Sequence, residues 1–91
     1  MSVDDPVVGG LREQISAADD ALVAAMNRRL ELARQIFEHK EASGIPILDP
    51  GREEAMVARL QRENRGPLSD DGVAELVRYV LGLTKQELGR G

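Results

Sequence analysis

The chain has 91 residues, enough for one small domain, and its net charge of −4 comes from 16 acidic and 12 basic residues. This balance, with an aromatic content of 2%, argues against a nucleic-acid-binding protein, which normally carries a basic excess. The absence of cysteine excludes disulfides and thiolate metal sites, and we find neither a run of about 18 apolar residues nor a signal peptide. We therefore expect a soluble, cytoplasmic protein with no nucleic-acid or membrane partner.

The longest predicted element is a helix from residue 11 to about residue 43. It contains no proline or glycine, and its apolar residues recur at helical spacing. Gly44, followed by a proline two residues later, is typical of a helix end. Residues 1–10 lack this periodicity, so we expect a flexible lead-in there and a helical domain over residues 11–91.

Two shorter helices are predicted to follow. Asp49 and Pro50 are typical of an N-cap followed by proline at the first helical position, and this helix should end near Asn64. After a Gly-Pro break, Ser69 or Asp70 caps the third helix. No segment alternates with a period of two residues over a useful length, so the predicted fold class is all-α.

The first helix is too long for the other two to cover. Its roughly 33 residues would form a rod of about 50 Å, whereas the other helices have about 14 and 19 residues. A monomer would leave much of the apolar seam of this rod in water. The simplest cover is a second copy of the chain, so we expect a homodimeric helical bundle with three helices per chain.

Each predicted helix carries polar residues on its core-facing stripe. In the first helix, Arg29 and Lys40 point within roughly 20° of Leu22. Glu53 shares the apolar face of the second helix, and Thr84 shares that of the third. Because unpaired buried charge is costly and arginine binds carboxylates through two parallel hydrogen bonds, this pattern predicts a pocket for an anionic ligand with carboxylates.

Other interpretations of the same residues stay open. Long basic side chains often lie along apolar surface with their charged ends in water, and Arg29 could simply pair with Glu53. His39 lies about 100° from the line of Lys40, and neither a nucleophile pair nor a metal-binding cluster is evident. The pocket therefore suits a reaction that needs only conformational restraint and charge stabilisation, without metal or cofactor.

Four segments of the sequence carry a more specific pattern. They are Leu11-Arg12-Glu13-Gln14-Ile15 with Asp19, Arg28-Arg29-Leu30-Glu31-Leu32-Ala33, Lys40, and Asp49-Pro50-Gly51-Arg52-Glu53. In this order and spacing they resemble the all-helical (AroQ-class) chorismate mutases, over about residues 11–88. The resemblance implies an intertwined homodimer of three-helix chains that rearranges chorismate, a small dianion, to prephenate in phenylalanine and tyrosine biosynthesis.

The resemblance also implies roles for the cations of the first helix. Arg29 would hold a substrate carboxylate within its own subunit, and Arg12 would reach the other carboxylate from the partner chain. Lys40 would contact a carboxylate and the ether oxygen of the bond that breaks. These three side chains would then bind the substrate at its two anionic ends.

For the remainder of the site, the resemblance implies contacts with the ring. Glu53, helped by Arg52 and the backbone near Asp49, would hold the ring hydroxyl, and Thr84 stands where the family has a small hydroxyl residue. Leu88 occupies a position where many members carry glutamine or glutamate, which donates to the ether oxygen. Loss of such a donor costs about 2–4 kcal/mol of barrier, so we expect slow turnover by the protein alone.

The end of the chain points to an activating partner. Leu88-Gly89-Arg90 resembles the ending of an actinobacterial subclass whose members are activated by docking onto DAHP synthase. Rival activities of the same fold are a 4-amino-4-deoxychorismate mutase and an isochorismate pyruvate lyase. A non-catalytic helical adaptor is a further alternative, but it gives no reason for Arg29 and Lys40 to face inward.

Overall fold

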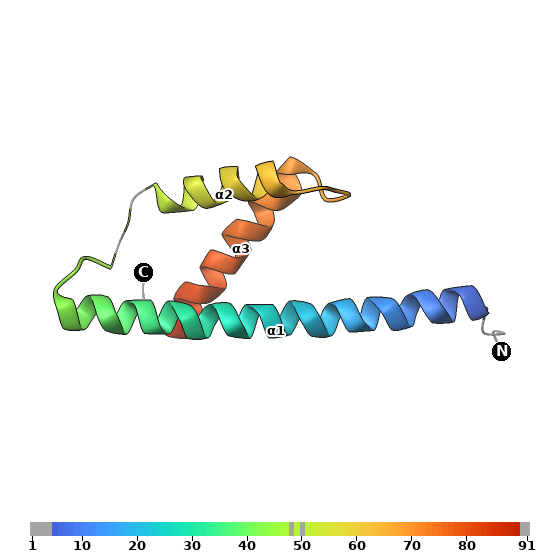
Figure 1. The fold of residues 1–91 in the computed structure, drawn as a ribbon, viewed down its shortest axis with the longest axis horizontal. Coiled ribbons are helices and arrows are strands. Elements are labelled where there is room, and N and C mark those ends of the chain that lie inside the picture. The colour runs from blue at the N-terminus through green and yellow to red at the C-terminus, as the bar shows by residue number, and fades with distance from the viewer. Residues whose placement is uncertain (1–4, 48, 50, 90–91) are drawn as a thin grey trace.

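The computed structural model describes residues 5–47, 49 and 51–89, and this part of the chain forms three α-helices and no strand. They are α1 (Pro6–Ser43), α2 (Arg52–Glu63) and α3 (Asp70–Leu88). Helix α1 runs along the whole 61 Å length of the molecule, α2 lies beside its C-terminal half, and α3 crosses back from α2 to α1 (Figure 1). The predicted all-α class is confirmed. None of the described helices is long and apolar enough to cross a membrane.

Helix α1 begins at Pro6, five residues before the start that the sequence predicted. The Asp5 carboxylate accepts hydrogen bonds from the backbone N–H groups of Val7 (2.8 Å) and Val8 (3.2 Å). Proline is favourable in a first turn because its missing N–H would have no helical partner there. The flexible lead-in predicted for residues 1–10 is therefore corrected to helix over residues 6–10, and residues 1–4 lie outside the described part.

The start of α2 also differs from the prediction. Gly51, not Asp49, is the N-cap residue, with a φ of 89° that favours glycine, and no side chain caps this helix. Asp49 contributes its backbone instead, because its carbonyl oxygen accepts a hydrogen bond of 3.2 Å from the Arg52 N–H. Pro50, the predicted first helical residue, lies outside the described residues.

The other predicted helix ends are confirmed. Ser69 is the N-cap of α3, and its hydroxyl accepts a hydrogen bond of 3.0 Å from the Gly72 N–H. Gly44 ends α1 in the left-handed conformation, with a φ of 69°. Gly89 ends α3 in the same way, with a φ of 65°, at a position that the sequence analysis did not name. Asn64 follows the last residue of α2. Each of these ends depends on short-range backbone geometry that the sequence encodes locally.

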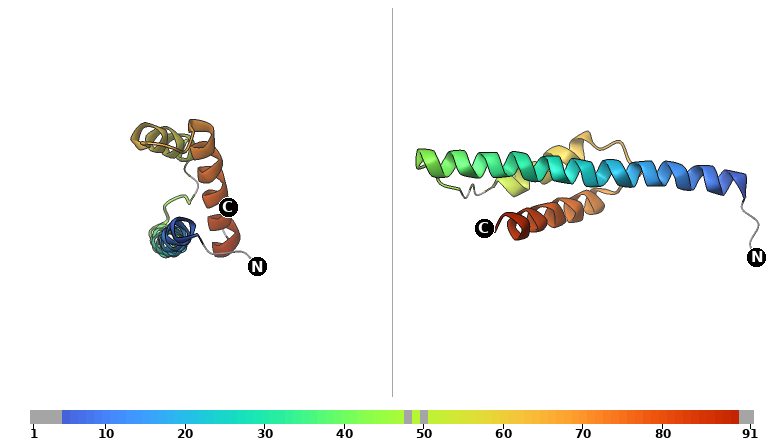
Figure 2. Two further views of the ribbon diagram at one scale, coloured as in Figure 1. Left: turned by 90° about the vertical axis from the view of Figure 1, so that its right-hand side faces the viewer. Right: turned by 90° about the horizontal axis from the view of Figure 1, so that it is seen from below.

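Among the described residues the core is small and lies on α3. Val73, Ala74 and Val77 are its buried apolar side chains, and Val77 is only 1% exposed. Helix α3 packs against both α2 and α1, and the end-on view shows it spanning the two (Figure 2). The N-terminal half of α1 extends beyond the other helices and leaves large apolar side chains exposed, including Ile15 (58%) and Leu22 (62%). One chain therefore leaves most of this seam uncovered.

We predict that the protein forms a homodimer through the exposed seam of α1. Sedimentation equilibrium should give about twice the single-chain mass of 9.9 kDa, because burying apolar surface drives association. Leu22→Glu should abolish the dimer, since it places charge on the seam. Asp20→Asn, about 200° away around the helix, should leave the mass unchanged. A folded wild-type species at the single-chain mass would contradict the prediction.

Candidate active site

A cavity opens between the three helices, all of which contribute to its lining. Its volume of about 370 Å³ lies in the size range of small-molecule sites. Its walls come from the C-terminal half of α1, the segment before α2, the first turns of α2 and the last turns of α3. The charged and polar side chains in its lining are Arg29, Lys40, Asp49, Arg52, Glu53, Thr84 and Lys85.

One stripe of α1 forms a whole wall of the cavity. Arg29, Ala33, Phe37 and Lys40 follow one another at spacings of three or four residues, which places them on a single helix face. Lys40 follows Arg29 by 11 residues, which corresponds to about 16 Å along the helix, so the two cations stand at opposite ends of an apolar wall. The Lys40 ammonium donates a long hydrogen bond of 3.5 Å to the carbonyl oxygen of Ile47.

Arg29 is fixed in place by α3 and α2. Its Nη1 donates to the Thr84 hydroxyl oxygen at 2.9 Å, and its Nη2 lies 3.8 Å from the Met56 sulfur. Thr84, only 5% exposed, donates its own proton to the Val80 carbonyl oxygen at 2.8 Å. The hydroxyl has a single proton, so it accepts from Arg29 while it donates to its own helix. These two hydrogen bonds hold the guanidinium at the cavity wall.

The cavity carries an excess of positive charge. Four cations line it against two carboxylates. The pKa of Arg29 is lowered, first because burial removes water from the guanidinium and second because the charge of Arg52 is nearby. Among the described residues Arg29 forms no ion pair, so the alternative pairing with Glu53 is not found. An anion bound in the cavity would relieve both penalties.

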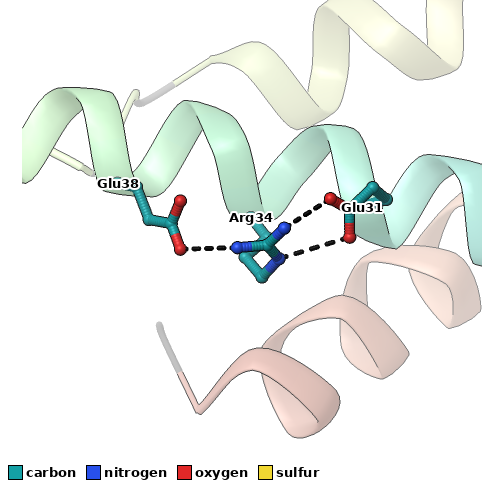
Figure 3. Close-up of polar contacts among 3 residues, drawn as sticks. All are labelled: Glu31, Arg34 and Glu38. Carbon is teal, nitrogen blue, oxygen red and sulfur yellow. Dashed lines mark hydrogen bonds and ion pairs between the residues drawn. The ribbon is translucent and has the colours of Figure 1, made fainter.

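Arg34, another cation of α1, is in a different electrostatic environment from Arg29. It lies between Glu31 and Glu38 on the exposed surface and forms an ion pair with each (Figure 3). The hydrogen bonds to Glu31 and then to Glu38 raise the pKa of Arg34, and the bond from Arg34 lowers the pKa of Glu31. Its charge is neutralised within α1, whereas that of Arg29 is left for a ligand.

Most of the predicted site residues meet in this cavity, and two do not. Arg29, Lys40, Asp49, Arg52, Glu53 and Thr84 all line it. Leu88 lies one turn beyond Thr84 on α3, half-buried and outside the lining. Arg12 lies on the exposed N-terminal half of α1, about 25 Å along the helix from Arg29, so it cannot reach the cavity of its own chain.

Lys85 is a lining residue that the sequence analysis missed. It follows Thr84 directly and lies four residues after Leu81, which also lines the cavity. The (i, i+4) spacing of Leu81 and Lys85 beside Thr84 was the available signal, because such residues share a helix face.

Comparison with known proteins decides the family. A family model described as chorismate mutase type II matches residues 11–87. The chain belongs to the chorismate mutase type II family. It is 42% identical over 72 residues to the T-protein of Enterobacter agglomerans, and 36% identical over 70 residues to a bifunctional chorismate mutase/prephenate dehydratase of Neisseria gonorrhoeae. These matches cover 78% and 77% of this chain but 19% of each relative, so the chain spans about a fifth of the length of these curated relatives.

Solved structures place the fold in the same family. Two structures of the chorismate mutase from Thermus thermophilus, Form I and Form II, superpose with TM-scores of 0.80 and 0.83, at 27% and 26% identity. They cover 85% and 91% of this chain and 96% and 94% of the solved chains. The three-helix arrangement of this family member is thus matched over nearly the full length of those chorismate mutases.

We predict that the Arg29–Thr84 hydrogen bond couples α1 to α3 energetically. A double-mutant cycle of Arg29→Met and Thr84→Val should give a coupling free energy of about 1 kcal/mol, because the two groups contact each other directly. Urea unfolding of the four proteins measures it. Thr84→Ser keeps the hydroxyl and should preserve the coupling to Arg29. Strictly additive effects of the two substitutions would contradict the prediction.

Proposed function

We propose that this protein catalyses the rearrangement of chorismate to prephenate. The observation that carries the proposal is the excess of cations in a small-molecule cavity of a chorismate mutase type II chain. Chorismate is a dianion, and its rearrangement is intramolecular, so the site must supply conformational restraint and charge stabilisation rather than a nucleophile. The lining residues offer both.

In the proposed mechanism, Arg29 and Lys40 bind the substrate from opposite ends of the α1 wall. Arg29 holds one carboxylate, and Lys40 contacts a carboxylate together with the ether oxygen. Binding both ends holds the enolpyruvyl chain over the ring, where a carbon–carbon bond forms as the carbon–oxygen bond breaks. Negative charge that develops on the ether oxygen is then stabilised by a cation already in position.

The ring hydroxyl is assigned to the opposite wall. Glu53 accepts its proton in a hydrogen bond, with Arg52 and the backbone near Asp49 beside it. Arg52 and Glu53 both belong to the first turn of α2. Their position therefore depends on Gly51, the N-cap residue of this helix. Thr84 acts through Arg29, which it holds by the hydrogen bond described above.

Homodimerisation is part of the proposal. Arg12 of one chain would enter the cavity of the other and bind the second carboxylate. Two features support this: the uncovered seam of α1, and the position of Arg12 far from its own cavity. We also place the protein in the cytoplasm, since a cysteine-free sequence fits a reducing compartment.

Activation by DAHP synthase stays a prediction for the C-terminal end. Its support is the Leu88-Gly89 ending, in which Leu88 brings no polar group to the cavity lining. Gly89 caps α3, and Arg90 and Gly91 lie outside the described residues. Because a site without a polar donor at Leu88 is expected to be slow, its turnover could be raised by such activation.

We predict that wild-type protein consumes chorismate and that Arg29→Ala and Lys40→Ala each lower kcat/KM by about 100-fold or more, because each removes a charge aimed at the substrate. The loss of chorismate absorbance measures this, with circular dichroism to verify the helices. Arg34→Ala is the matched control, since its charge is neutralised by Glu31 and Glu38, and it should keep activity. Wild-type protein without activity would refute the proposed function.

The effect of Glu53→Gln on kcat/KM distinguishes chorismate from its 4-amino analogue as the substrate. The amide keeps the size of the carboxylate but loses its charge. With chorismate, whose hydroxyl is neutral, we predict a loss in kcat/KM of about tenfold or less. With an ammonium in place of the hydroxyl, losing the opposing charge should cost about 100-fold. Measuring kcat/KM of the wild-type and variant proteins with both substrates tests this prediction. A loss in kcat/KM on chorismate larger than the one predicted would contradict the assignment of Glu53.

A further inference from the structure

Lys85 lies in the cavity wall that α3 contributes. Together with Leu81 and Thr84 it forms a continuous patch of lining on one face of this helix. Side chains of a helix lean towards its N-terminus, so the Lys85 stem is directed back over the turn that contains Leu81. Lys85 therefore belongs to the wall of the open cavity, although the side chain is exposed.

A lysine in the last turn of a helix also has an ordinary explanation. Positive charge near the C-terminus is favourable to the helix dipole by about 0.3–1 kcal/mol at an exposed site. That effect requires only proximity to the last carbonyl groups and does not explain a side chain that lines a cavity. In the described part of the chain, Lys85 makes no side-chain hydrogen bond or ion pair. Its ammonium is available to a ligand.

Two of the other three cations of the cavity differ from Lys85 in this respect, whereas Arg52 likewise makes no side-chain hydrogen bond or ion pair among the described residues. Arg29 already donates to Thr84, and Lys40 donates to the Ile47 carbonyl oxygen. Part of their hydrogen-bonding capacity is used by the protein, whereas that of Lys85 is not.

The charge of the lining gives Lys85 a specific role. Four cations and two carboxylates leave the cavity of one chain with a formal charge of +2. This equals the charge needed to neutralise a dianion with the residues of one chain. Without Lys85 the lining of that chain would carry +1, and neutralising the ligand would depend on Arg12 of the partner subunit. Uncompensated charge taken out of water is costly, so the fourth cation contributes directly to ligand binding.

We propose that Lys85 is a substrate-binding residue that contacts a carboxylate of the dianionic substrate. This inference rests on the proposed function, because it takes the ligand to be chorismate. A carboxylate is present in both the ground state and the transition state. Lys85 therefore acts chiefly on KM and leaves kcat nearly unchanged.

The absence of cysteine from the chain allows a direct test. Lys85→Cys introduces a single thiol, which bromoethylamine converts to a side chain with an ammonium at nearly the reach of lysine. Iodoacetamide gives a neutral side chain of similar length. We expect the unmodified variant to raise KM for chorismate about tenfold, the cationic modification to restore the wild-type KM, and the neutral one to leave it raised.

Gln86→Cys, treated in the same two ways, is the matched control. Gln86 is exposed and lies outside the cavity lining, so adding or omitting a cation there should not change KM. A wild-type KM in unmodified Lys85→Cys, equal rescue by the neutral reagent, or a loss confined to kcat would overturn the role of Lys85. Each of these outcomes requires an active wild-type protein, so failure of this inference is distinguishable from failure of the proposed function.

Discussion

The hydrogen bond between Arg29 and Thr84 is the contact on which the site depends. It joins α1 to α3 across 55 positions of sequence, and it orients a half-buried guanidinium at the cavity wall. The Thr84 proton is used on the Val80 carbonyl oxygen, so the hydroxyl can only accept from Arg29. The charge is thus held in position without being neutralised, which is the arrangement that favours binding of a carboxylate from outside the chain.

The two halves of α1 have different roles. Its C-terminal half supplies Arg29 and Lys40 to the cavity and packs against α3, whereas its N-terminal half exposes an apolar seam and carries Arg12 (Figure 1). Among the described residues the core has three buried apolar side chains, which is small for a chain of 91 residues. Covering the seam would therefore add substantially to hydrophobic stabilisation. In the proposed dimer, covering the seam and completing the cavity with Arg12 are one event.

Two identical dipeptides show where local patterns succeed and fail. Asp5-Pro6 and Asp49-Pro50 both have the composition of an N-cap followed by proline. Asp5 caps α1 through its side chain, although the sequence analysis placed that helix start later. Asp49 lines the cavity instead, and Gly51 is the N-cap of α2. The same local signal therefore has different outcomes, because Asp49 contributes its backbone carbonyl oxygen to the start of α2 and not a capping side chain.

The sequence alone determined the all-α class, the ends at Gly44 and Ser69, and the shared inward stripe of Arg29 and Lys40. These features follow from helical periodicity and capping, which act within a few residues. Only the tertiary structure decided that Arg29 bonds to Thr84 rather than to Glu53, and that Lys85 reaches the cavity wall. Both depend on the angle at which α3 crosses α1, and that angle is set by packing among residues far apart in the chain.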